Sequence, residues 1–427
     1  MKKLFAILAV LLFGFSLAQP ITIGVNLELS GRFATIGNST LQGIETALEE
    51  RPTVLGRDVE LSICDNATTV EGSVACANRF VDEGVVAVLG AISSSMSIPA
   101  AEVLQDAGII MISTSSTNPA TTQIGDYVFR MAYTDDFQGV VAARYAVDEL
   151  DAQSAAIFRQ QDDDYSFGLA GFFQDEFEAL GGSAIVVDFV ANTVDFSAQI
   201  NDIRGFNPDI VYAPGFCAEL ASLVPQLKQQ GFTQPLLGAD ASDDSQCPDG
   251  GGEAFDGWTF TGFGTPSQLP EAAAERARDF EALFRLVNPD ASDFNGFTLA
   301  GADSYNVTVE AVSQLPGFYE EALGVDAATV QDVWLAHLDD ANDDVLEAGG
   351  VSFFEGNATD ETFFAIGLLK DVLASIEGFS GVSGNITYEG TDGTPAARTI
   401  GFFEYEVPAD NDQGWAKIPL FGRSTAE

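Results

Sequence analysis

Positive charge is scarce in this chain. Its 427 residues include 18 Lys plus Arg against 64 Asp plus Glu, and the formal net charge is −46. So acidic a protein repels DNA, RNA and anionic lipid. We therefore expect no nucleic acid partner. Adaptation to a saline habitat and simple solubility both account for the acidity.

Histidine is nearly absent as well. His337 is the only one, which excludes a His-rich metal centre and disfavours a Ser-His-Asp or Cys-His nucleophile. The chain has no phosphate-binding glycine loop of the P-loop or dinucleotide-binding type. From these motifs we expect no cofactor, no metal and no catalytic residue.

Two acidic stretches resemble metal-binding loops without matching them. Asp162-Asp163-Asp164 lacks ligand spacing, and we interpret it as a solvated loop. Residues 291–296 (ASDFNG) approach a calcium loop, but Ala291 and Ala302 occupy the first and twelfth ligand positions. Neither stretch predicts a metal site.

Long apolar runs are confined to the N-terminus. Lys2 and Lys3 precede an apolar run of 12 residues, Leu4 to Phe15, and small residues follow at 16 and 18. This order is typical of a signal peptide, and the run is too short to span a membrane. We predict that residues 1–18 form a signal peptide and that the mature, soluble protein is periplasmic or secreted. The alternative, a buried N-terminal strand, fits neither the charge order nor the cleavage site.

Cysteine is sparse too, with four residues in a chain predicted to be exported. An even number in that setting is compatible with disulfides. Three pairings are possible. We favour Cys64–Cys76 and Cys217–Cys247 because each pair is local in the sequence.

Strand and helix patterns alternate along most of the chain. Continuous apolar runs such as Val85 to Leu89 predict strands that are covered on both faces, and amphipathic segments such as 70–83 predict helices between them. The alternation runs from Ile21 to Ile112 and resumes from Phe137 to Leu237. It predicts an α/β fold of two Rossmann-like lobes, each a parallel sheet flanked by helices.

Several element boundaries are also predicted. Asn38 or Ser39 is expected to cap a helix that runs to Glu50. A last strand over 399–406 is expected to precede an irregular tail. Beyond residue 264 we predict helices over 271–287, 297–315, 328–337 and 361–376.

Two loops rich in small hydroxyl residues follow neighbouring predicted strands. Residues 90–95 (GAISSS) come after Leu89, and residues 113–119 (STSSTNP) come after Ile112. Ligands of open α/β sheets bind at the carboxyl ends of the strands. Hydroxyls together with free N–H groups at a helix N-terminus suit a small carboxylate. Ordinary helix capping by Ser and Thr is the alternative for each loop.

These loops resemble periplasmic substrate-binding proteins of the leucine/isoleucine/valine-binding family, which serve ABC transporters. The resemblance extends over residues 21–315 and returns at 399–406. It is carried by the opening IGVNLELSGRFATIGNSTLQGIETAL, by the stretch 88–117, by Asp164-Tyr165-Ser166-Phe167-Gly168 and by PDIVYAPGF at 208–216.

The resemblance implies two lobes that close on a ligand about three hinge crossovers. The crossovers are expected near 132–136, 260–266 and 386–399. The N-terminal lobe would comprise residues 19–134 plus 265–390, and the C-terminal lobe 135–264 plus 391–427.

A ligand site between the lobes is implied in the same way. Ser94, Ser115 and Thr117 fall where the family holds the carboxylate and ammonium of its ligand, Ser115 largely through its backbone. Asp240 falls where an acidic residue, often Glu, meets the ammonium. Core packing is the alternative for the aromatic residues and helix capping for Asp240. Apolar walls are expected from Tyr165, Phe216, Phe297 and Ile36.

The function that the resemblance implies is an extracytoplasmic receptor. It would capture a small amino acid, branched-chain or related, and deliver it as a monomer to the permease of an ABC transporter. Relatives bind amides or urea, so these ligands stay open. An exported hydrolase that uses cleft carboxylates is an alternative of another class. A ligand-sensing ectodomain would share the fold and would need a following membrane span.

Overall fold

The computed structural model describes residues 19–291, 294–324, 326–339, 346–348, 351–353, 369–388, 391–395, 398–406 and 416–424. The predicted signal peptide lies outside these ranges, as do residues 361–368 of a predicted helix and parts of the segment 324–357. Among the described residues, no helix is long and apolar enough to span a membrane.

The first sheet has six strands in the order β2-β3-β1-β4-β5-β6. All neighbours are parallel except β2 and β3, which form an antiparallel pair. Its strands are β1 Ile21–Leu27, β2 Thr53–Val54, β3 Arg57–Asp65, β4 Ala87–Gly90, β5 Ile110–Ser113 and β6 Val128–Arg130. The connecting helices are α1 Ala34–Glu50, α2 Val70–Glu83, α3 Ser94–Ala107 and α4 Ala120–Gln123.

The second sheet has seven strands in the order β17-β16-β11-β10-β9-β7-β8, parallel from β11 to β8 and antiparallel at β16 and β17. Its strands are β7 Ser154–Gln160, β8 Ser183–Phe189, β9 Ile210–Tyr212, β10 Leu236–Gly238, β11 Thr259–Phe263, β16 Thr399–Glu406 and β17 Ala416–Ser424. The helices of this part are α5 Asp135–Asp148, α6 Asp164–Ala179, α7 Ser197–Arg204, α8 Cys217–Gln229, η1 Asp240–Ser242, α9 Gln246–Gly251 and η2 Gly252–Phe255.

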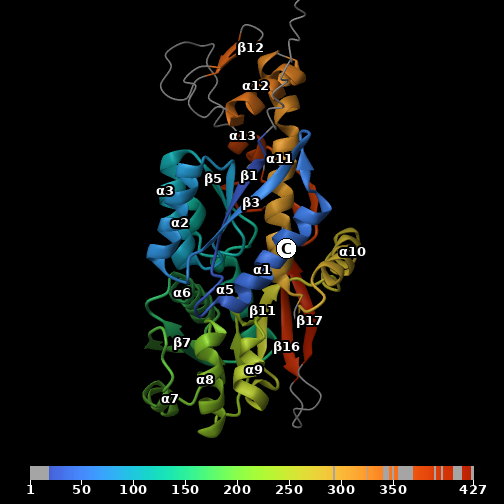
Figure 1. Cartoon of the computed structure of the whole chain (residues 1–427). Helices are drawn as coiled ribbons and strands as arrows, with labels where there is room; N and C mark the ends of the chain where they lie inside the picture. Colours follow the sequence, from blue (N-terminus) through green and yellow to red (C-terminus); the bar gives the residue numbers. More distant parts are fainter. Residues whose placement is uncertain are drawn as a thin grey trace, which may run out of the picture.

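Helices cover both faces of each parallel sheet, which is why inner strands such as β1 and β4 are buried along almost their whole length. In the first sheet, Ala87 and Leu89 of β4 join the core beneath α1, whereas Val88 joins the core beneath α2 and α3. Figure 1 shows the two sheets one above the other, with α1 to α3 around the upper one and α6 to α9 around the lower one. The predicted two-lobed α/β fold is confirmed.

The remaining elements pack mainly on the first lobe. They are α10 Glu271–Val287, α11 Gly296–Leu323, α12 Ala327–Asp339, α13 Leu369–Ala374 and two small hairpins, β12 Leu346–Ala348 with β13 Val351–Phe353 and β14 Phe379–Gly381 with β15 Gly384–Ile386. The helix α11 lies along α1, and α13 packs on α11.

The chain passes between the two sheets at three places: between β6 and α5, between β11 and α10, and before β16. At the last crossing, Gly393 still accepts a hydrogen bond at 3.0 Å from the backbone N–H of Arg130 in β6. Gly393 therefore lies against β6 of the first sheet.

Three sequence-based boundaries were wrong. The helix α1 begins at Ala34, and Asn38 lies inside it, where its side chain donates to the Ala34 carbonyl at 2.6 Å. The helix begins before the expected cap because the side chains of Phe33 and Ile36, near its first turn, are buried in the core. The helix α11 continues through Pro316, with the buried Tyr319 beyond it.

The third correction concerns the tail, which contains the strand β17. It pairs antiparallel with β16, with a register shift between Phe402 and Phe403. Pro419 and Gly422 obscure the strand pattern in the sequence. Proline is tolerated here because β17 is the edge strand of the sheet.

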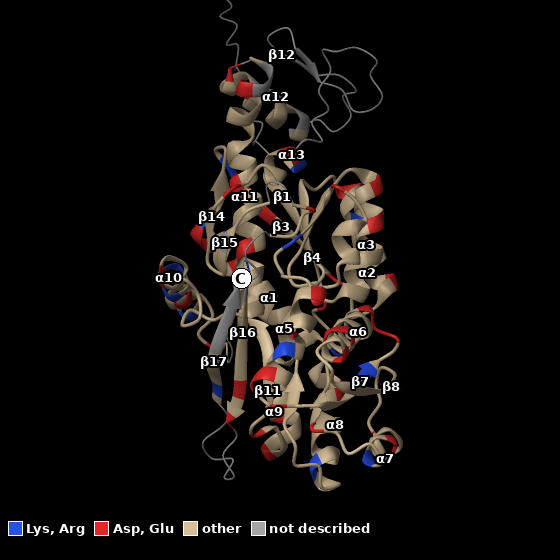
Figure 2. Cartoon of the chain, turned by 180° about the vertical axis from the view of Figure 1, so that it is seen from behind, with Lys and Arg blue, Asp and Glu red and all other residues tan. Residues whose placement is uncertain are grey.

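Both sequence-based disulfides are confirmed. Cys64 at the end of β3 is bonded to Cys76 of α2, and Cys217 at the start of α8 is bonded to Cys247 of α9. Asp and Glu residues are distributed over both lobes, whereas Lys and Arg are few (Figure 2).

Candidate functional site

A small cavity lies between the two lobes, at the carboxyl ends of strands from both sheets. Seven of the eight residues that the sequence analysis assigned to the ligand site line it, from segments more than 200 positions apart. The cavity is lined by Ile92, Ser93, Ser94, Ser115, Thr117, Tyr165, Phe216, Asp240, Ala241 and Phe297.

Ile36 is the exception. It does not line the cavity, and its side chain is 1% exposed in the hydrophobic core. The neighbouring Phe33 does not line the cavity either, but its ring stacks on that of the lining residue Phe216, with centroids 3.8 Å apart. The aromatic wall continues to Tyr165, whose ring centroid lies 5.4 Å from that of Phe216.

The two hydroxyl-rich loops form the polar wall of the first lobe. Ser94 accepts hydrogen bonds from the Ser116 hydroxyl at 3.0 Å and the Asn118 N–H at 3.3 Å. The N-cap residues of the two following helices, Ser93 and Pro119, make no side-chain cap bond. Helix capping therefore does not account for these hydroxyls.

Glu28 holds the first of these loops in place. Its buried carboxylate, just after β1, accepts hydrogen bonds from the Ile92 N–H at 3.2 Å, from the Ser93 N–H at 3.1 Å and from the Ser93 hydroxyl at 3.0 Å. Burial raises the pKa of Glu28 above its ordinary value, and the hydrogen bonds oppose that rise. The sequence analysis missed this residue, although an acid directly after a buried strand was a usable signal.

Glu28→Gln is expected to weaken ligand binding. The amide NH₂ of glutamine would face the Ile92 N–H, so one buried hydrogen bond is lost, at a cost of about 1–3 kcal/mol. The loop that carries Ile92, Ser93 and Ser94 is then less firmly held. Calorimetric affinity and thermal denaturation measure the two effects. Glu60→Gln, an exposed change on β3, is the matched control, and equal affinities in the two variants would contradict a positioning role.

Asp240 is the acidic group of the second lobe. Its Oδ1 accepts hydrogen bonds from the Tyr165 hydroxyl at 2.7 Å and the Gln138 amide at 2.8 Å. Burial raises the pKa of Asp240 to about 6, and these hydrogen bonds oppose the rise. The N-cap residue of η1 is Ala239, and no side chain makes a cap hydrogen bond there. Asp240 is therefore not a helix cap. The helix-capping alternative is thereby excluded.

The acidic run before α6 was misinterpreted in part. Asp162 and Asp164 are exposed as expected, but Asp163 is buried. Its carboxylate accepts from the Ser166 N–H at 2.9 Å, which caps α6, and from the Ser95 hydroxyl at 3.2 Å. Burial raises the pKa of Asp163 to about 6. The tertiary contact with the first lobe buries this carboxylate, and no local pattern shows that.

Polar contacts join the lobes around the cavity. The guanidinium of Arg32, in the loop before α1, donates to the buried Glu219 of α8 at 3.1 Å. Ser95 of α3 accepts from the Asp164 N–H at 2.8 Å. The structure thus has the lobes in contact around the cavity.

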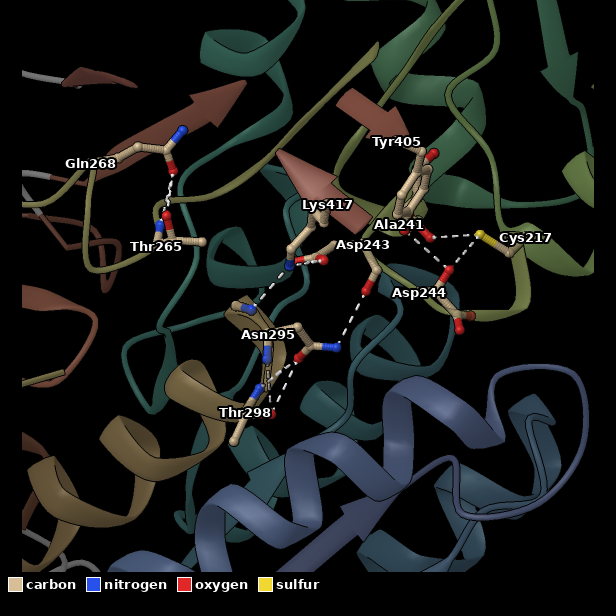
Figure 3. Close-up of polar contacts among 12 residues, drawn as sticks. Cys217, Ala241, Asp243, Asp244, Thr265, Gln268, Asn295, Thr298, Tyr405 and Lys417 are labelled. Atoms are coloured by element: carbon tan, nitrogen blue, oxygen red, sulfur yellow. Dashed lines mark hydrogen bonds and ion pairs between the residues drawn. The ribbon is translucent and has the colours of Figure 1, made fainter. Parts of the chain in front are cut away.

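Asp243, just after η1, fixes the loop that carries Asp240. It forms an ion pair with Lys417 of β17 and accepts from the Gly296 N–H at 3.2 Å, and its carbonyl accepts from the Asn295 amide at 3.3 Å (Figure 3). Asn295 is also the N-cap of α11. This network links the loop of Asp240 to the segment that presents Phe297.

A small cavity shared by two lobes, with polar groups from both, is the arrangement of a bilobal binding protein that encloses a small molecule. A family model described as periplasmic binding protein matches residues 20–352, and the chain belongs to this family. The family implies an extracytoplasmic location. The resemblance noted in the sequence is confirmed.

Individual relatives agree with this family. The chain is 33% identical over 301 residues to an amino acid binding protein of Pseudomonas aeruginosa, covering 66% of this chain and 79% of that protein. It is 29% identical over 286 residues to the leucine-specific-binding protein of Salmonella typhimurium, covering 66% and 75%.

Solved structures show the same fold. A leucine binding protein, LivK, from Thermotoga maritima superposes with a TM-score of 0.74 at 26% identity, covering 93% of this chain and 98% of that chain. A solute binding protein from R. palustris in complex with benzoate superposes with a TM-score of 0.71 at 16% identity, covering 95% and 96%.

Proposed function

We propose that the chain is an extracytoplasmic solute-binding receptor. It captures a small amino acid, branched-chain or related, between its lobes and delivers it to an ABC importer. The observation that carries this proposal is the pairing, in one cavity, of the hydroxyls of Ser94 and Thr117 with the buried carboxylate of Asp240. A zwitterion needs donors for its carboxylate and an anion for its ammonium.

The cavity walls favour an apolar side chain. Ile92, Phe216 and Phe297 line it together with the ring of Tyr165. Polar amides or urea would leave these walls without a complementary partner. Leucine, isoleucine and valine are therefore the first ligands to test.

We further propose that the protein acts as a monomer and without chemistry on its ligand. The first lobe would comprise residues 19–134 and the segment from 265 to the last crossing before β16, and the rest would form the second lobe. Hinge motion about the three crossings would open and close the cavity.

A thermal-shift screen tests this function. The mature protein, in salt, is heated with each common amino acid, with small amides and with urea. A ligand that binds only the folded state raises the midpoint, and we expect the largest rise with leucine, isoleucine or valine. A rise only with amides or urea would contradict the amino-acid assignment. Mass spectrometry of the ligand before and after incubation tests the hydrolase alternative, which requires turnover.

A further inference from the structure

Arg32, in the loop between β1 and α1, is a cation of the first lobe that reaches the second lobe. Its Nη1 donates to Oε1 of Glu219 in α8 at 3.1 Å and to Oε1 of Gln160, the last residue of β7, at 3.3 Å. The strand β7 belongs to the second sheet, and α8 connects two further strands of that sheet. The guanidinium therefore bridges the two lobes.

Glu219, the partner of Arg32, is a buried carboxylate with a relative exposure of 1%. Its Oε1 also accepts a hydrogen bond from the Asn192 N–H at 2.8 Å, whereas its Oε2 has no hydrogen-bond partner among the described residues. A buried carboxylate is costly unless it is paired with a cation. Separation of the lobes would take Arg32 away and break this ion pair.

The same guanidinium covers an aromatic stack at the wall of the cavity. Its Cζ lies 4.3 Å from the ring centroid of Phe33 and 5.9 Å from that of Phe216. Phe216 lines the cavity, Phe33 stacks on it and is buried, and the side chain of Arg32 is 19% exposed. A cation is attracted to the face of an aromatic ring. Arg32 thus holds the stack from its solvent side.

Closure of the cavity brings two acidic lobes together. Asp and Glu outnumber Lys and Arg in the chain and are spread over both lobes (Figure 2). Like charges that approach one another repel, so a cation at the interface offsets this repulsion. Arg32 also acts on Asp163 of the second lobe, because burial raises the pKa of that carboxyl to about 6 and the charge of Arg32 lowers it. Two buried carboxylates of one lobe, Glu219 and Asp163, therefore face a cation of the other.

We propose that Arg32 is a latch that holds the lobes closed over the ligand, through its ion pair with Glu219 and its contact with the stacked rings of Phe33 and Phe216. The inference rests on the proposed function, which supplies the ligand that the closed lobes enclose. Arg32 does not line the cavity, so it is a positioning residue that acts on the ligand through the two rings. Because the ion pair joins the lobes, it forms only once they have met. The latch therefore slows dissociation of the ligand and leaves its association unchanged.

Stopped-flow measurement of leucine association and dissociation tests the latch. Arg32→Met keeps an apolar stem over Phe33 and removes the charge. We expect the dissociation rate to rise about tenfold and the association rate to stay that of the wild type. Arg32→Lys keeps the charge and should recover part of the slow dissociation. Slower association with unchanged dissociation would indicate a role in ligand capture and would overturn the proposal.

Arg159→Met is the matched control. Arg159 forms an ion pair with Asp188 at 2.7 Å, and its Cζ lies 4.5 Å from the ring centroid of Phe167. The surroundings thus resemble those of Arg32, but all three residues lie on β7, β8 and α6 of the second lobe. This variant should bind and release leucine at wild-type rates. A tenfold faster release here as well would show that loss of any such arginine has the effect.

The partner of the ion pair gives an independent test. Glu219→Gln keeps the volume and one acceptor oxygen and should also speed dissociation. If the two residues act through one contact, the double variant Arg32→Met/Glu219→Gln should release leucine no faster than the faster of the two single variants. Effects that multiply in the double variant would show that the two residues act separately, contrary to the latch.

The two proposals fail in different ways. If the wild type binds leucine and Arg32→Met releases it at the wild-type rate, the latch is wrong and the amino-acid receptor stands. If the wild type binds none of the amino acids, the proposed function falls, and small-angle X-ray scattering of the ligand-free proteins decides the latch. A larger radius of gyration for Arg32→Met than for the wild type and Arg159→Met would support the latch, and equal radii would overturn it.

Discussion

Asp240→Ala is expected to remove most of the affinity for an amino acid. Truncating one partner of a buried charge pair costs about 2–5 kcal/mol, because the ammonium group is left buried and unpaired. The substitution also leaves the Tyr165 hydroxyl and the Gln138 amide without the acceptor that they share. Isothermal titration calorimetry in salt should show a loss of about 30-fold to several thousand-fold, since about 1.4 kcal/mol corresponds to a factor of ten.

Two further variants make this result interpretable. Asp240→Asn keeps the volume and one acceptor oxygen, so a similar loss in this variant would assign the effect to the charge. Asp249→Ala removes an exposed carboxylate from the nearby α9 and should leave the affinity unchanged. Wild-type affinity in a folded Asp240→Ala variant would show that this carboxylate does not meet the ligand.

Removal of the disulfide Cys217–Cys247 is the second change with a large expected effect. The bond closes a loop with a sequence separation of 30 residues. In the chain-entropy model such a bond stabilises the fold by about 3–4 kcal/mol. It also ties the segment after Phe216 to the segment after Asp240, and both residues line the cavity. The double variant Cys217→Ser/Cys247→Ser should therefore lose both stability and ligand affinity.

The other disulfide supplies the matched control. Cys64–Cys76 spans only 12 residues and joins β3 to α2, and neither cysteine lines the cavity. Its double serine variant should lose about 2–3 kcal/mol of unfolding free energy and keep its affinity. Denaturant unfolding gives the stability of each variant, and calorimetry gives the affinity. A loss of affinity in both variants alike would argue against a specific role for Cys217–Cys247 at the cavity.

Much of the architecture follows from local patterns. Continuous apolar runs such as Val85 to Leu89 can be stable only when both faces are covered, so they indicate parallel strands between helices. The helix over 271–287 was predicted at its observed ends, because its amphipathic pattern is bounded by Pro270 and Asn288. The strand β17 was missed because its sequence contains Pro419, and because its pairing with β16 cannot be seen from its own residues.

The candidate site likewise combines residues that the sequence predicted with residues that it missed. Ser94, Ser115, Thr117 and Asp240 were placed from motifs, and the structure brings them to one cavity. Glu28 and Phe33 were missed, since each acts through a contact with a segment distant in the sequence. Asp163 was interpreted as part of a solvated loop because the acidic run lacks metal-ligand spacing, but its carboxylate is buried and accepts a hydrogen bond from Ser95 of the other lobe.

The sequence by itself determined the α/β class, the cysteine pairs and the hydroxyl loops at the strand ends, because each depends on residues near one another in the chain or on strand and helix periodicity. Only the tertiary structure decided which acidic side chains are buried. Among 64 Asp and Glu residues, composition cannot tell which ones the fold buries, Glu28 and Asp163 among them. Burial matters because desolvation changes the properties of a carboxylate only where the fold removes it from water.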